Sequence, residues 1–152
     1  ADAYADFEEI VAKATDGFEA LQEARKTIKR VDQALVNAPD STKKTIAEQG
    51  KALTEQIDEL EKRYMMPEGL KGIQRSSENV RGYLRGAGRY LSASEGAPNQ
   101  PAKVMIEKAT RETQQVVDKV NAFFANDFAA YRKEVENVPF SLFEEYEPIT
   151  WE

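Results

Sequence analysis

Apolar side chains recur every three or four residues in four separate stretches of this 152-residue chain, and prolines separate the stretches. In an α-helix this spacing keeps the apolar residues on one face, because each turn takes about 3.6 residues. The first stretch has the longest such stripe, which consists of Phe7, Val11, Ala14, Phe18, Leu21, Ala24, Ile28, Val31 and Leu35. No run alternates with period two for long enough to indicate a β-sheet. The sequence therefore predicts an all-α protein.

Prolines, glycines and capping residues set the expected helix bounds. Pro39 ends the first helix, because the residue before a proline avoids the helical conformation. Asp40 or Ser41 is predicted to cap the second helix, and Ser76 or Ser77 the third. The four helices are expected at about 6–36, 41–64, 77–91 and 102–137.

Four amphipathic helices joined mostly by short loops favour an up-down-up-down four-helix bundle, which we assign to residues 1–137. The short third helix leaves parts of the first and fourth to be covered by the connector, the tail or another domain. The tail, residues 138–152, is irregular because prolines interrupt it. It carries six large apolar side chains among acidic ones, so we expect it to dock on the bundle. These six are Phe140, Leu142, Phe143, Tyr146, Ile149 and Trp151.

The absence of His and Cys excludes several kinds of active site. A Ser-His-Asp triad, a His-ligated zinc site, a thiol nucleophile and a thiolate metal site all need one of the two residues. The carboxylate groups Glu8/Glu9, 58–61 and Glu144/Glu145 could be imagined as acid–base pairs of a glycosidase, but neighbours on a helix point in different directions. We therefore expect a non-enzyme with no catalytic residue, no metal and no cofactor.

Charge and hydropathy constrain the partners. The chain has 21 Lys and Arg against 27 Asp and Glu, a net charge of -6, which argues against nucleic acid as a partner. No apolar run approaches the roughly 18–20 residues of a membrane span. The chain begins at Ala1 without a signal-peptide pattern, so we expect a processed product or an excised domain. The expected partner is a protein, either an adjacent domain or a separate chain, and the sequence predicts no particular oligomeric state.

The third helix carries the one basic block, with Arg81, Arg85 and Arg89 at positions i, i+4 and i+8. These steps place the three guanidinium groups along one helix edge, where they could bind a phosphate, a sulfate or a carboxylated sugar. A solvated edge, or a dock for the acidic tail, is the interpretation that we favour. The glycines between the arginines, Gly82, Gly86 and Gly88, indicate close packing against a neighbouring helix.

Aromatic residues gather in the fourth helix and the tail. They could form a stacking platform for sugar rings, but core packing together with a docked tail is favoured. If the tail crosses to another domain, Tyr146 and Trp151 become partner-binding residues. The aromatic residues of the fourth helix are Phe123, Phe124, Phe128 and Tyr131.

Several short stretches resemble the C-terminal helical region of bacterial secreted proteins with a BNR-repeat, sortilin-type β-propeller, which are often labelled glycosyl hydrolases. The stretches are Tyr4-Ala5-Asp6-Phe7, residues 21–26, residues 57–61, residues 71–75, residues 90–98, residues 120–124 and residues 141–148. The resemblance covers nearly the whole chain, but each stretch consists of common helical residues.

The resemblance implies a helical region that follows a propeller and carries no catalytic residue. It also implies an extracytoplasmic location, secreted or periplasmic. The expected function is therefore a non-catalytic accessory or interaction domain of a larger secreted protein. The alternative is a small bundle that binds an anionic or sugar ligand through its basic third helix.

Overall fold

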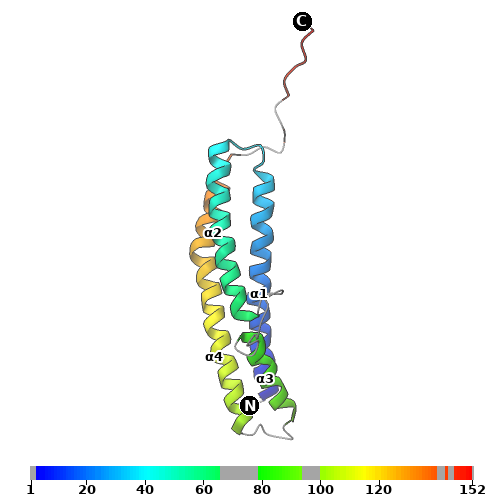
Figure 1. Cartoon of the computed structure of the whole chain (residues 1–152), viewed down its shortest axis with the longest axis vertical. Coiled ribbons are helices and arrows are strands. Elements are labelled where there is room, and N and C mark those ends of the chain that lie inside the picture. Colours follow the sequence, from blue (N-terminus) through cyan, green and yellow to red (C-terminus); the bar gives the residue numbers. More distant parts are fainter. Residues whose placement is uncertain (1–2, 66–78, 94–99, 140–142, 144–145, 152) are drawn as a thin grey trace, which may run out of the picture.

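The structure, a computed structural model, describes residues 3–65, 79–93, 100–139, 143 and 146–151, and these form an elongated helical bundle with a C-terminal tail (Figure 1). The described part of the chain contains no strand. The prediction of an all-α bundle is therefore confirmed. The elements are α1 (Ala3–Ala34), α2 (Asp40–Tyr64), α3 (Val80–Ala93), α4 (Gln100–Phe123), the π-helical turn η2 (Phe124–Phe128) and α5 (Ala129–Glu136).

The helix α3 continues in the direction of α2 instead of reversing it. Along α2 the chain runs antiparallel to α1, and Tyr64 at the end of α2 lies against Gly17. Farther on, Gly88 of α3 lies against Phe7, closer to the start of α1. Figure 1 shows α3 following α2 along the length of the bundle toward the start of α1. The chain was expected to run up, down, up and down through four helices. Instead it runs up along α1, down along α2 and then α3, and up again along α4, η2 and α5, so the helices form three rods.

This arrangement resolves the unequal helix lengths that the sequence predicts. The first rod, α1, has 32 residues. The second rod consists of α2 with 25 residues and α3 with 14. The third rod consists of α4 with 24 residues, η2 with 5 and α5 with 8. The three rods therefore contain 32, 39 and 37 helical residues. Because their lengths match, α3 covers the part of α1 and α4 that α2 does not reach.

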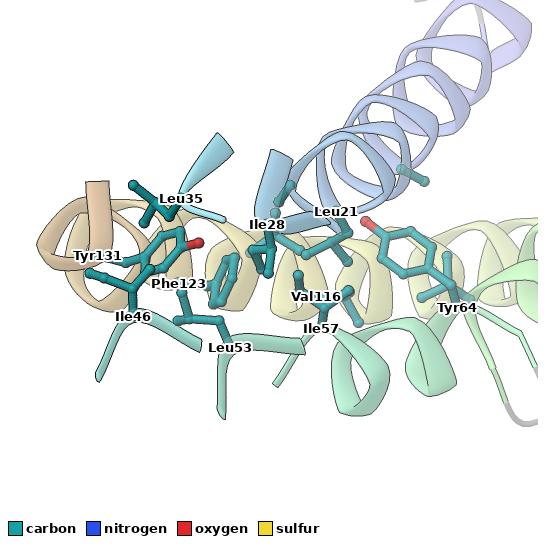
Figure 2. Packing of buried hydrophobic residues seen from close by; sticks show 14 residues of the cluster. Leu21, Ile28, Leu35, Ile46, Leu53, Ile57, Tyr64, Val116, Phe123 and Tyr131 are labelled. Atoms are coloured by element: carbon teal, nitrogen blue, oxygen red, sulfur yellow. The ribbon is translucent and has the colours of Figure 1, made fainter. Parts of the chain in front are cut away.

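Large aliphatic and aromatic side chains fill the core between α1, α2 and the third rod. In Figure 2 the labelled side chains of these elements point toward one another. Leu21 and Ile57 have no exposed surface at all, and burial of such a side chain contributes about 1.5–3 kcal/mol. The cluster consists of Ala14, Leu21, Ala24, Ile28, Leu35, Ile46, Leu53, Ile57, Tyr64, Val80, Val116, Val120, Phe123 and Tyr131.

Small residues bring α3 close to its neighbours. Ala87 of α3 and Ala102 of α4 are fully buried. A Cβ atom at Gly86 would lie 2.8 Å from the Met105 side chain of α4, and one at Gly88 would lie 3.5 Å from Phe7 of α1. The predicted close packing is therefore confirmed at Gly86, whereas the contact at Gly88 is an ordinary van der Waals contact.

The caps of α2 and α3 differ from those expected. Pro39 is the N-cap of α2 and provides no side-chain cap, and the helix begins at Asp40. Asp40 instead lies in the first turn, where the negative charge of a carboxylate interacts favourably with the helix dipole. The cap of α3 is Asn79, whose Oδ1 accepts a 2.8 Å hydrogen bond from the Gly82 amide. The expected caps of α3, residues 76 and 77, lie outside the described residues.

The π-helical turn η2 keeps one apolar face along the third rod. Val116 and Val135 are 19 residues apart, so in an uninterrupted α-helix they would point about 100° away from each other. A π-turn takes up one additional residue and returns the second half of the rod to the core. Val116 is buried, and Val135 packs against the same cluster. This turn was not predicted from the sequence, although the apolar residues between Val116 and Phe128 recur in steps of four residues, which is its signal.

Candidate interaction surfaces

The described part of the tail is exposed. The side chains of Phe143, Tyr146, Ile149 and Trp151 are 84%, 76%, 75% and 96% exposed. Residues 146–151 form neither helix nor strand, and they extend beyond the end of the bundle (Figure 1). The predicted docking on the bundle is therefore not seen for these residues. Among the described residues, the apolar faces of the three rods pack mainly against one another, which leaves the tail without a place in that core.

The arginines predicted as an anion site lie together on α3. Arg81, Arg85 and Arg89 are all exposed, and none forms an ion pair with a carboxylate of the described residues. The predicted shared edge is therefore present.

The start of α4 adds to this basic surface. Residues 79–93 contain three arginines and no acidic residue, and residues 100–111 contain three basic residues and one acidic residue. The net charge of the two stretches is thus +5. The amine of Lys108 lies 4.9 Å above the centre of the Tyr83 ring, a cation–π contact that joins α4 to α3. The opening turns of α1 at this end are acidic, with Asp6, Glu8 and Glu9, so the basic surface is confined to α3 and α4.

The tail and the arginines lie at opposite ends of the molecule. α3 lies beside the first turns of α1, whereas residues 146–151 lie beyond the turn that joins α1 to α2 (Figure 1). The interpretation that the acidic tail docks on the arginines of its own chain is therefore not seen for the described tail residues. Tyr146 and Trp151, the predicted partner-binding residues, are both exposed.

The aromatic residues of the third rod belong to the core. The ring centres of Phe123 and Phe124 are 5.1 Å apart, and those of Phe124 and Phe128 are 5.2 Å apart with nearly perpendicular planes. Tyr131 joins them, with its ring centre 6.0 Å from that of Phe128. Such edge-to-face packing stabilises a core, and it leaves no flat aromatic platform for a sugar ring.

A shallow groove lies between α2 and the third rod, next to η2. Apolar side chains such as Leu60 and Phe123 form its floor, and acidic side chains lie on its rim. The residues that line it are Ala52, Glu55, Gln56, Glu59, Leu60, Lys119, Ala122, Phe123, Asn126 and Asp127. This groove was not predicted from the sequence, because its position depends on which rods are neighbours in the fold.

The acidic residues of 58–61, which were considered as an acid–base pair, form ion pairs. Arg25 of α1 donates to Asp58 at 2.6 Å and to Glu61 at 2.9 Å, which joins α1 to α2. Glu59 instead accepts from Lys62 at 2.8 Å. The described residues contain no group of three acidic side chains placed to hold a metal ion, and Glu144/Glu145 lie outside them.

Two buried tyrosines have raised pKa values. Burial raises the pKa of Tyr64 to about 12. Burial, together with the nearby charge of Asp32, raises the pKa of Tyr131 to about 12. Neither hydroxyl has a hydrogen-bond partner. The Tyr64 hydroxyl faces Gly17, where a Cβ atom would overlap it. Both tyrosines are packed in the core cluster.

No protein-family model, curated protein or solved structure matches this chain. None of the helices in the described residues has both the length and the apolar character needed to cross a membrane. The tail and the basic surface of α3 and α4 are therefore the two candidate surfaces for a function.

Proposed function

We propose that this chain is a non-catalytic interaction domain, whose helical bundle presents the C-terminal tail to another protein. The observation that carries the proposal is the exposure of the tail. Tyr146, Ile149 and Trp151 are 75–96% exposed within six residues, although side chains of this size are normally buried in a fold or an interface. Aromatic anchors on a short segment are the residues that dominate binding energy in many interfaces.

The bundle supports this role because it is complete without the tail. Its core is closed by the three rods, and the ion pairs Arg25–Asp58 and Arg63–Glu112 join α1 to α2 and α2 to α4. A stable bundle that holds an apolar segment in water fits an accessory domain that docks on, or positions, a larger partner.

The larger protein that we propose is a secreted β-propeller protein of the glycosyl hydrolase-like kind, a context that rests on the sequence resemblance alone. An antibody against the chain tests it by reporting the size and location of the native gene product. A much larger extracytoplasmic product is expected. A native product of 17.1 kDa inside the cell would contradict the context and leave the interaction role standing.

The test of the interaction role compares a tail variant with a matched control in the native host. The tail variant replaces Tyr146, Ile149 and Trp151 with serine. The control is Val36→Ser, which removes an apolar side chain that is 60% exposed outside the tail. After cross-linking in cells, we expect the wild type and the control to retain the same partner and the tail variant to lose it. Equal recovery of partners by all three proteins would contradict the proposal.

A second candidate function is binding of an anionic ligand by α3, and the exposed row Arg81, Arg85 and Arg89 favours it. Titration with a sulfated oligosaccharide, followed by NMR of the arginine side chains, tests this function. Binding that disappears in Arg85→Gln is expected. No shift of the three arginines at any ligand concentration would contradict it.

A further inference from the structure

We infer that two copies of the chain associate antiparallel, so that the tail of each copy binds the basic surface of α3 and α4 on the other. This inference rests on the proposed function, because it names a second copy as the protein that receives the tail. Two features of the described residues carry it, the placement of exposed apolar side chains and the placement of charge.

Exposed apolar side chains gather at the two ends of the bundle. Among the large apolar side chains that the structure describes, seven are exposed. Four belong to the tail, and a fifth, Val36, belongs to the turn at the same end of the bundle. The other two are Tyr90 of α3, which is 45% exposed, and Val104 of α4, which is 52% exposed. The tail therefore finds apolar surface at the far end of the bundle.

Charge follows the same division. Residues 138–152 contain four glutamates and no basic residue, a net charge of -4, whereas the described stretches of α3 and of the start of α4 sum to +5. Opposite charges steer two surfaces together and fix their register. The groove between α2 and the third rod is a poorer receptor for the tail, because its rim carries Glu55, Glu59 and Asp127 against Lys119.

Geometry selects a pair over a self-docked monomer. The tail leaves one end of the bundle and the arginines lie toward the other (Figure 1). An antiparallel pair with two-fold symmetry places each tail beside the partner's α3, and it closes because both contacts form at once. The dimensions agree, since residues 146–151 span about 17 Å when extended, and the helix between Arg81 and Arg89 rises about 12 Å.

A charge exchange tests the pairing in solution by light scattering and sedimentation. One variant replaces Glu144, Glu145 and Glu147 with lysine, and the other replaces Arg81, Arg85 and Arg89 with glutamate. All three arginines are exposed, so circular dichroism should show an unchanged bundle. We expect the wild type to dimerise at low salt. Each variant alone should associate at least about tenfold more weakly.

The mixture of the two variants is the decisive sample. In a mixed pair the lysine-bearing tail meets glutamates on α3, and the unchanged tail meets unchanged arginines, so dimerisation should return. Failure of the mixture to dimerise, after both variants lost association, would overturn the inference. The inference would also be overturned if neither charge exchange weakened the association of the wild type, or if the wild type assembled into open-ended oligomers instead of dimers.

A measurement on the wild type keeps the test independent of the variants. Trp151 is the single tryptophan and is 96% exposed, so its emission reports on the tail alone. We expect a blue shift on raising the protein concentration and its reversal by salt, which screens the charges. If the wild type stays monomeric and its tryptophan emission does not change with protein concentration, the inference is wrong. The proposed function still stands in that case if the serine variant of the tail loses its cellular partner, and both fail if it does not.

Discussion

The core of the bundle and the tail place the same kinds of side chain in opposite surroundings. Ile57 of α2 has no exposed surface, whereas Ile149 of the tail is 75% exposed. Tyr64 is 5% exposed and Tyr146 is 76% exposed. The difference lies in the neighbours, because Ile57 belongs to a stripe that repeats with the helix period and Ile149 follows Pro148 in a segment without helix. Apolar composition therefore predicts that a side chain seeks cover, but not that its own chain provides it.

The largest expected effect contrasts the two isoleucines. Ile57→Ala should lower the free energy of unfolding by about 3 kcal/mol, because it removes a fully buried side chain and leaves a cavity. Ile149→Ala should change it by no more than about 0.5 kcal/mol. Urea denaturation of both variants at a low protein concentration measures the contrast. Similar losses in the two variants would mean that the tail is part of the folded core.

Alkaline pH tests the buried tyrosines of the bundle. In the folded chain Tyr64 and Tyr131 keep their protons up to about pH 12, whereas in the unfolded chain the ordinary pKa is 10.0. Their stabilising contribution is therefore complete below about pH 10 and decreases between pH 10 and 12. The expected decrease is about 1.4 kcal/mol per pH unit for each tyrosine.

Denaturation curves across this pH range measure that decrease. The variant Tyr64→Phe should show a shallower dependence on pH, since it has lost one of the two groups. A pH dependence that both tyrosine-to-phenylalanine variants leave unchanged would show that other groups cause it.

Two glycines sharpen the comparison inside the bundle. Gly17→Ala should destabilise by about 1–2 kcal/mol, because the new methyl group overlaps the buried Tyr64 hydroxyl. The matched change Gly88→Ala meets only an ordinary contact of 3.5 Å with Phe7, so the gain in helix propensity should stabilise by up to about 1 kcal/mol. Thermal unfolding of both variants provides the comparison.

The double variant Gly17→Ala with Tyr64→Phe completes the experiment. Removing the hydroxyl, which has no hydrogen-bond partner, should relieve most of the loss caused by the alanine. If the alanine costs as much beside phenylalanine as beside tyrosine, the overlap is not its cause.

The smallest effect concerns the start of α3. Asn79→Ala removes the side-chain cap of the Gly82 amide and should cost about 1 kcal/mol. Hydrogen exchange measures the loss locally, and the first-turn amides of α3 should exchange faster while those of α2 stay protected. Equal protection of α3 in the variant and the wild type would contradict the role of Asn79 as the cap.

The candidate surfaces were predictable to different degrees. The arginine edge follows from steps of four residues on one helix, so it could be read from the sequence, and the structure places all three arginines in solvent. The groove beside η2 and the basic surface shared by α3 and α4 could not be read from the sequence, because each depends on which helices are neighbours in the fold. The exposure of Tyr146 and Trp151 could not be predicted either, since it depends on whether the bundle leaves an apolar face uncovered.

The sequence by itself determined the helices, their approximate ends and their buried faces, because the apolar period and the prolines act within a few residues. It also determined that no histidine or cysteine is present for catalysis. Only the tertiary structure decided that α3 continues in the direction of α2. It also decided that the π-turn η2 returns the apolar face of the third rod to the core, and that the Tyr64 side chain packs against Gly17. These features arise from matching rod lengths and packing volumes between segments far apart in the chain, which no local pattern encodes.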